Sequence, residues 1–183
     1  MLTGYKLSYP LNRLPMISKS ISLTKIELSL AETIGLARYH ANRQQGVHNA
    51  RVGNQSNAFT DINAMAGEIA FCKMFNRYPD MSVDEHPVYD VLMFGCTVDV
   101  KTTRYDSGKL LATLKCAGKP CDYYSLMVGD YTKSNNFDYR GSTTGHELFS
   151  KNNIGSLGYG DTYIINQSNL REVTFKCHTM ISI

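Results

Sequence analysis

Three ionisable residues interrupt two short apolar runs near the middle of the chain. Asp90 begins the first run, and Asp99 and Lys101 lie within the second. Residues two apart in a β-strand point to the same face, so Asp99 and Lys101 share a face. If the runs pair as a hairpin about Gly95-Cys96, Asp90 lies beside the same end of the second strand. Two carboxylates and a lysine would then converge, an arrangement that can hold a divalent metal ion and direct a water molecule onto a phosphate.

Two helices are expected before this hairpin. The first should begin near Lys25, capped by Ser22 or Thr24, and Thr24 and Glu27 have the spacing of a capping box. Apolar residues recur at helical spacing from there, and Gly46 is a suitable end. Residues 46–60 are rich in Gly, Asn and Ser, a composition that favours a loop.

The second helix is expected from Thr60 or Asp61 to about Asn76. Its apolar residues form two stripes, which predicts packing on more than one side. Glu68 interrupts this apolar surface. A buried glutamate is rare unless it is paired or bound to a metal, so Glu68 is a candidate for the same site as the hairpin residues.

The remaining elements complete a mixed α/β domain. The patterns predict strands over 88–105, 110–115, 123–131 and 163–166, a loop over 132–143, a short helix over 144–152, a turn over 155–160, a turn or helix start over 167–170, and an edge strand or tail over 174–183. Residues 1–20 are expected to form an N-terminal arm and residues 21–183 a single domain, an α/β fold with a mixed sheet flanked by helices.

The hairpin segment resembles the catalytic core of the PD-(D/E)xK nuclease superfamily, which has the restriction-endonuclease-like fold. Asp90 and the triplet Asp99-Val100-Lys101 match the family motif, and Glu68 matches the Glu that many members carry on the preceding helix. The match covers roughly residues 60 to 130. Tyr89 stands where the name-giving proline would be. The resemblance implies an αβββαβ-type core and a metal-dependent nuclease.

The resemblance also implies roles for the motif residues. Asp90, Asp99 and the Val100 carbonyl are expected to bind Mg²⁺, with Mn²⁺ as a substitute. Glu68 is expected to bind the same ion or a second one, directly or through water. Lys101 is expected either to stabilise the charge that develops on the phosphate, or to orient the attacking water and help to deprotonate it.

The charge distribution favours a polyanionic partner. Seven basic residues face two acidic ones over 1–60, two face seven over 61–100, and ten face seven over 101–183. An acidic centre between basic flanks suits a site that binds a cation and, around it, a nucleic acid. DNA is the expected substrate, and RNA is also compatible. The candidate nucleic-acid contacts are Arg51, Arg104, Lys109, Lys115, Lys119 and Arg140.

Bulk properties narrow the class further. No run of 18 or more apolar residues occurs and the first residues lack a signal-peptide core, so no membrane span and a cytoplasmic location are expected. Five scattered cysteines without a CxxC pair are typical of reduced thiols. A small nuclease of this kind would suit a phage or a mobile element. Its cutting is expected to be structure-dependent or weakly specific, or else to depend on recognition through a homodimer or a partner protein.

Three other readings compete with the nuclease. Asp99 and Lys101 also fit an ordinary exposed strand face, with Val98 and Val100 toward the core. The chain would also fit a non-catalytic nucleic-acid-binding or assembly protein that retains the fold, or a hydrolase of a smaller phosphate ester. The non-catalytic protein would bind nucleic acid whether or not Mg²⁺ is present.

Overall fold

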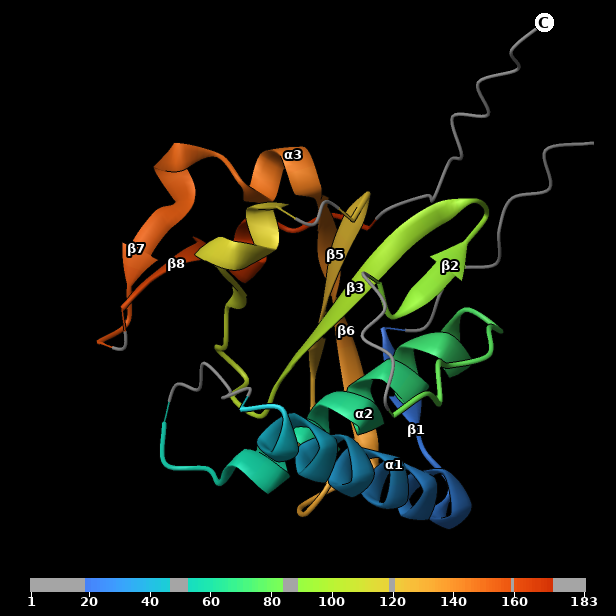
Figure 1. Cartoon of the computed structure of the whole chain (residues 1–183). Helices are drawn as coiled ribbons and strands as arrows, with labels where there is room; N and C mark the ends of the chain where they lie inside the picture. Colours follow the sequence, from blue (N-terminus) through green and yellow to red (C-terminus); the bar gives the residue numbers. More distant parts are fainter. Residues whose placement is uncertain (1–18, 47–52, 84–88, 119–120, 159, 173–183) are drawn as a thin grey trace, which may run out of the picture.

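A five-stranded mixed sheet separates two helices from a smaller three-stranded sheet (Figure 1). The computed structural model describes residues 19–46, 53–83, 89–118, 121–158 and 160–172. Residues 1–18 of the predicted arm over 1–20 and the predicted strand or tail over 174–183 lie outside these residues. The end of the predicted arm is in fact structured, because Ser20 begins a strand of the large sheet. The predicted α/β class, with a mixed sheet and flanking helices, is confirmed.

Helix α1 (Lys25–Gln44) begins where its cap predicts. The Thr24 side chain accepts from the Glu27 N–H, and the Glu27 carboxylate accepts from the Thr24 N–H, which closes the capping box. Gly46 follows the helix with a φ of 69°, a left-handed conformation that suits glycine. The predicted limits of this helix are therefore confirmed.

Helix α2 (Asn57–Met74) begins earlier than the sequence pattern predicts. The expected caps were Thr60 and Asp61, but the Ser56 side chain accepts from the Phe59 N–H and caps the helix four residues sooner. The segment over 46–60, which its composition predicts as a loop, therefore contains the first turn of this helix. As predicted, the helix is packed on more than one side, and residues 65–72 are all buried.

The large sheet has the strand order β1-β6-β5-β3-β2. Strand β3 pairs in parallel with β5, and all other pairs are antiparallel. Its strands are β1 (Ser20–Ser22), β2 (Val91–Met93), β3 (Cys96–Thr103), β5 (Tyr123–Val128) and β6 (Asn136–Thr144). Val98 and Val100 on β3 point into a core with Met65 and Phe71 of α2. This packing fixes β3 against α2, the element that carries Glu68.

The predicted hairpin is present as β2 and β3. Its register pairs Val91 with Val98 and Met93 with Cys96. The turn is formed by Phe94 and Gly95, with φ of 50° and 82°, and not by Gly95-Cys96 as predicted. Positive φ at both central residues is typical of the type I′ turn that two-residue hairpins favour.

Strand β6 occupies most of the segment that the sequence pattern predicts as a loop over 132–143. Phe137 and Tyr139 alternate into the core, while Asp138 and Arg140 point outward. The pairing with β5 shifts register near Gly141, whose φ is 117°. This bulge and the polar outer face hide the strand from a search for continuous apolar runs.

A separate three-stranded sheet covers the second face of β5 (Figure 1). It has the order β4-β8-β7 and is built from β4 (Leu110–Thr113), β7 (Ile154–Ser156) and β8 (Asp161–Ile165). The 3-10 segment η1 (Leu114–Gly118) follows β4, α3 (Gly145–Leu148) and η2 (Lys151–Asn153) precede β7, and η3 (Gln167–Asn169) follows β8. Leu110, Leu148 and Ile165 form a second core with Tyr124 and Leu126 of β5. No helix among the described ranges is long and apolar enough to cross a membrane.

Gly67 allows α2 to approach β3 closely, and we predict that Gly67→Ala destabilises the fold by about 2 kcal/mol. An added Cβ would lie 1.9 Å from Thr102 Oγ1 and within 2.9 Å of the Thr102 Cγ2 and Cβ atoms, so rotating the threonine cannot relieve the overlap. The measurement is the free energy of unfolding in urea. Gly118→Ala is the control, because no atom lies within 4 Å of its added Cβ. Equal stability of the two variants would contradict the prediction.

Candidate active site

Asp90 lies directly before β2 and caps the open end of the hairpin. Its N–H donates to the Val98 carbonyl at 3.0 Å, and its Oδ2 accepts from the Val100 N–H at 2.6 Å. The carboxylate therefore takes the place of the next β2 residue along the edge of β3. A strand residue directs its N–H and C=O to the same side, so the Val100 carbonyl also lies on the Asp90 edge.

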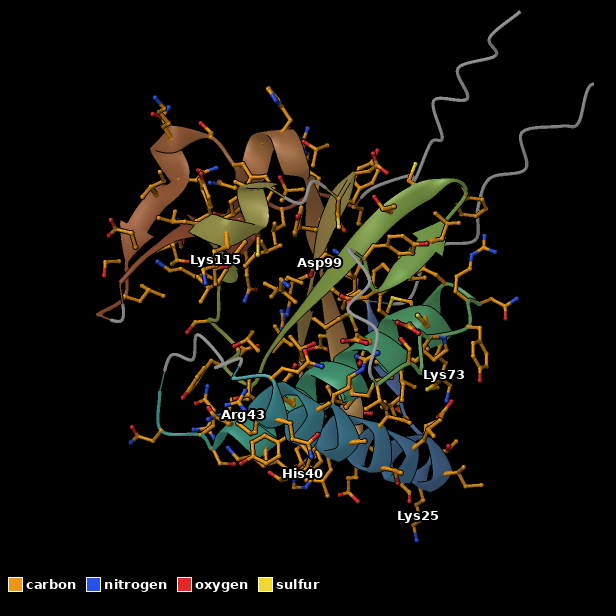
Figure 2. All side chains as sticks on the ribbon, viewed as in Figure 1. Lys25, His40, Arg43, Lys73, Asp99 and Lys115 are labelled. Carbon is orange, nitrogen blue, oxygen red and sulfur yellow. The ribbon has the colours of Figure 1, made fainter. Side chains whose placement is uncertain are left out.

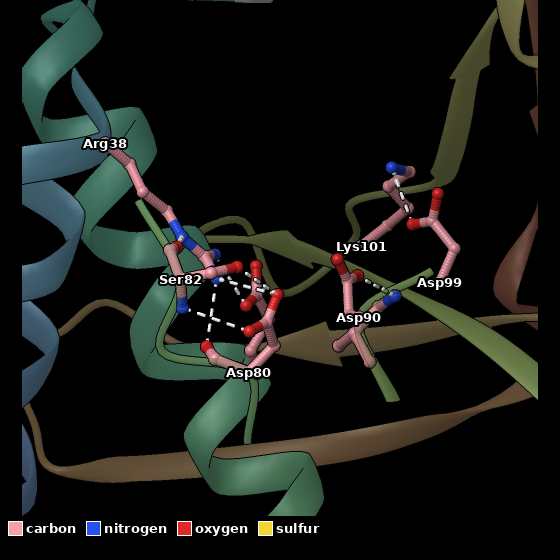
Figure 3. Close-up of polar contacts among 8 residues, drawn as sticks. Arg38, Asp80, Ser82, Asp90, Asp99 and Lys101 are labelled. Atoms are coloured by element: carbon pink, nitrogen blue, oxygen red, sulfur yellow. Dashed lines mark hydrogen bonds and ion pairs between the residues drawn. The ribbon is translucent and has the colours of Figure 1, made fainter. Parts of the chain in front are cut away.

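Asp99 and Lys101 share the opposite face of β3 from Val98 and Val100, as their spacing predicts. Lys101 Nζ lies 2.6 Å from Asp99 Oδ1. The Asp99 side chain is 14% exposed and that of Lys101 is 34% exposed. The pair is therefore half-buried, and the hypothesis of an ordinary solvent-exposed strand face does not describe it. Figure 3 shows Asp90, Asp99 and Lys101 grouped at the same part of β3.

Glu68 is buried in the middle of α2 and pairs with Arg38 of α1. Arg38 Nη1 donates to Glu68 Oε2 at 2.8 Å, and the two side chains are 21% and 8% exposed. The same guanidinium donates through Nε to the Ser82 carbonyl and through Nη2 to the Asp80 carbonyl. Arg38 thus joins α1, α2 and the segment that leads toward Asp90 (Figure 3).

Burial and mutual repulsion perturb the acidic groups of the site. Burial raises the pKa of Asp90 well above its usual value, and the nearby Glu68 and Asp99 carboxylates raise this pKa further. Burial also raises the pKa of Glu68, although Arg38 opposes this change. Burial lowers the pKa of Lys101, but Asp99 and Asp90 outweigh it and hold the pKa above the ordinary lysine value. Lys101 therefore keeps its positive charge at neutral pH.

A pocket of about 490 Å³ adjoins these residues and is lined by Glu68, Asp90, Val100 and Lys101 at one end. Asp99 is not among the lining residues, and it reaches the pocket through its ion pair with Lys101. The structure therefore brings together all four residues that the sequence singles out for chemistry. They come from α2, the residue before β2, and β3.

The candidate nucleic-acid contacts fall into different places. Arg104 and Lys109 line the pocket, and Lys115 is exposed on η1 beside the small sheet (Figure 2). Arg140 instead forms ion pairs with Asp106 at 2.5 Å and Asp138 at 3.1 Å, which reduces its charge available to a phosphate. The two remaining candidates, Arg51 and Lys119, lie outside the described residues.

Sequence reasoning missed the positioning role of Arg38. Its partners lie 30 to 44 residues away along the chain, and two of them are backbone carbonyls, so no local motif shows the connection. Asp80 also folds onto Ser82, accepting from its N–H at 3.0 Å and its hydroxyl at 2.8 Å. The signal available in the sequence was an arginine on the first predicted helix together with a glutamate that interrupts the apolar surface of the second.

Arg38→Ala is predicted to destabilise the protein by about 3 kcal/mol, because it leaves the Glu68 carboxylate buried without its cation. Urea unfolding measures this change. Arg171→Ala is the matched control, since Arg171 also binds a glutamate, Glu147, but the two side chains are 65% and 41% exposed. The control should lose less than about 1 kcal/mol. Adding Glu68→Gln to Arg38→Ala should restore part of the stability, and no restoration would contradict the assigned cause.

The fold and site define a mixed α/β protein with a pocket, lined by both acidic and basic side chains, at the junction of a helix and a β-hairpin. Residues 12–144 match the sequence family DUF5843, a family of unknown function, and the chain belongs to that family. The match includes Glu68, Asp90, Asp99 and Lys101. No curated protein and no solved structure matches the chain.

Proposed function

We propose that this protein is a metal-dependent nuclease of the PD-(D/E)xK type that hydrolyses phosphodiester bonds of DNA. The observation that carries the proposal is the convergence of Glu68, Asp90 and Lys101 on one pocket, with Asp99 paired to Lys101. The order of α2, β2 and β3 supports it, because the family places its acidic and lysine residues on the same three kinds of element. The finer assignment to the restriction-endonuclease-like fold is part of this proposal.

The donor set fits Mg²⁺, which binds proteins through one or two carboxylates and keeps several waters. No group of three or more His, Cys, Asp or Glu side chains that could hold a metal occurs within the described part of the chain. Asp90 and Asp99 with the Val100 carbonyl are nevertheless enough for this ion. Burial and repulsion disfavour the ionised Asp90, and a cation would offset both. Mn²⁺ has the same preference for oxygen ligands.

Bound Mg²⁺ would supply an activated water and neutralise charge on the phosphate. The residues of the chain have complementary tasks. Lys101 remains charged beside Asp99 and can stabilise the negative charge that builds on the phosphate oxygens. Its raised pKa favours this role over that of a proton acceptor, because a general base must lose its own proton near the working pH. Glu68, held by Arg38, places a carboxyl group among the residues that line the pocket.

The direct test is cleavage of supercoiled, linear, single-stranded and branched DNA with Mg²⁺ or Mn²⁺, by the native protein and by Asp99→Asn. Metal-dependent cleavage that the variant loses, while its circular dichroism stays native, is the expected result. Absence of cleavage by the folded native protein on every substrate and with both metals would reject the proposal.

A non-catalytic nucleic-acid-binding protein is the second candidate. One observation favours it: each acidic group already has a protein partner, namely Arg38 for Glu68, the Val100 N–H for Asp90, and Lys101 for Asp99. Such a protein would bind DNA equally well with Mg²⁺ or with a chelator, and Asp99→Asn would not weaken its binding.

A further inference from the structure

The lining of the pocket includes an arginine that lies over two aromatic rings. The Arg104 guanidinium carbon lies 5.4 Å from the Phe59 ring centroid and 5.1 Å from the Tyr105 centroid. Its Nη2 also donates to the Tyr105 hydroxyl at 3.2 Å. Within the described residues no carboxylate lies at ion-pair distance from Arg104, although its charge helps to lower the pKa of Asp130. The guanidinium is in contact with the rings and lines the pocket. Flat cationic and aromatic surfaces of this kind stack nucleobases.

The loop that carries Tyr105 is fixed before any ligand binds. The Gly108 N–H donates to the Tyr105 carbonyl at 2.8 Å and closes a tight turn. Gln167 Nε2 donates to the carbonyls of Asp106 and Gly108, each at 2.7 Å, and Arg140 holds the Asp106 carboxylate. Tyr105 nevertheless remains 42% exposed at the mouth of the pocket. A ring held in place in this way loses little freedom when a base stacks on it.

The size and walls of the pocket favour a single nucleotide over a duplex. Its volume of about 490 Å³ lies within the usual range of small-molecule sites, and Leu111, Leu126 and Leu157 form apolar walls. An enzyme that acts on a base-paired nucleotide in such a pocket must first extrude it, at an unstacking cost of a few kcal/mol. An unpaired strand enters without that cost.

We propose that this pocket receives one unpaired nucleotide of a DNA strand, with its base on the Phe59–Arg104–Tyr105 surface and its phosphate toward Lys101. The substrate class is then single-stranded DNA or the unpaired portion of a branched duplex. Lys109, which is exposed and also lines the pocket, is placed to contact the strand as it leaves. This inference rests on the proposed nuclease function and names its substrate.

The absence of tryptophan from the chain allows a specific binding test. Tyr105→Trp, combined with Asp99→Asn to prevent cleavage, places a single indole at the mouth of the pocket. Titration with a thymidine oligonucleotide in a chelating buffer should quench its fluorescence. A blunt duplex of equal length should bind at least about tenfold more weakly.

The fluorescence anisotropy of a labelled single strand measures how strongly further variants bind it. Tyr105→Leu and Arg104→Ala should each weaken its binding about tenfold, the usual effect of losing one stacked base. Arg77→Ala is the control, because Arg77 also lies over a ring, that of Phe94 at 4.5 Å, but does not line this pocket. Equal quenching by duplex and single strand, or unchanged binding by both pocket variants, would overturn the inference.

The experiments distinguish a failure of the nucleotide-pocket proposal from a failure of the nuclease proposal. If Asp99-dependent cleavage occurs equally on duplex and single-stranded DNA, the nuclease stands and the nucleotide pocket fails. If single strands bind with the expected dependence on Tyr105 and Arg104 while no metal supports cleavage, the pocket stands and the nuclease fails.

Discussion

Lys101→Met should reduce metal-dependent cleavage at least about 100-fold, the effect of removing one preorganised charge from a reacting oxyanion. The substitution keeps most of the side-chain volume but removes the ammonium group, with both its charge and its ion pair with Asp99. Because Asp99 and Asp90 keep Lys101 protonated in the native protein, its contribution should not decline as the pH rises through the neutral range. The loss in Lys101→Met should therefore be similar at pH values on both sides of neutrality.

Single-turnover cleavage at saturating Mg²⁺ measures this effect without a contribution from product release. Lys151→Met is the matched control, because Lys151 is exposed on η2 and does not line the pocket. It should cleave at nearly the native rate. A large loss in Lys101→Met that disappears on raising the DNA concentration would assign Lys101 to substrate binding and contradict its role in stabilising the reacting phosphate.

Asp90→Asn should have two opposite effects: it should abolish cleavage and stabilise the metal-free protein by about 1 kcal/mol, a usual gain when a strained functional site is relieved. Asparagine can still accept from the Val100 N–H, so the hairpin contact is kept. The substitution removes the repulsion from Glu68 and Asp99 that raises the pKa of Asp90. Cleavage is lost because the substitution also removes the Asp90 carboxylate that would bind the cation.

The pH dependence of this stabilisation has a definite sign. The folded protein holds the Asp90 proton more tightly than the unfolded chain does, because the folded-state pKa is raised. Native stability from this group is therefore present below the ordinary aspartate pKa of about 3.9 and is lost as the pH rises through the folded-state pKa. The stability difference between Asp90→Asn and the native protein should be small in acid and grow toward neutral pH.

Thermal unfolding at several pH values, with and without Mg²⁺, measures both effects. A change of 1 kcal/mol corresponds to about 2–4 °C for a chain of this size. Mg²⁺ at about 100 times its dissociation constant should stabilise the native protein by about 2.7 kcal/mol and Asp90→Asn by much less. Equal stabilisation of both proteins by Mg²⁺ would show that Asp90 does not bind the ion.

Local sequence signals predict the helix–hairpin part of this structure well. Thr24 and Glu27 fix the start of α1 because a capping box needs only residues three apart. The type I′ turn at Phe94-Gly95 and the alternation of Val98 and Val100 set the hairpin and its faces, although the turn lies one residue before its predicted place. The grouping of Asp90, Asp99 and Lys101 follows from that local geometry.

Long-range contacts account for what the sequence did not show. Strand β6 has a polar outer face and a bulge at Gly141, and its pairing with β1 and β5 makes it a strand. Arg38 is drawn inward by Glu68 and the 80–82 segment, far along the chain. Gln167 anchors the pocket loop across about sixty residues. None of these contacts produces a periodic pattern or a fixed spacing in the sequence.

The two separate cores have a consequence for how the protein opens. Strand β4 pairs with β8 and not with the large sheet, so the small sheet and its core form a unit of their own on one face of β5. Units of this kind open at lower free energies than the whole fold. We expect the amides of β4 and β8 to exchange hydrogen faster than those of β3 and β5. Leu111 and Leu157 belong to this more labile unit, so its opening would widen one wall of the pocket while the acidic residues stay in place.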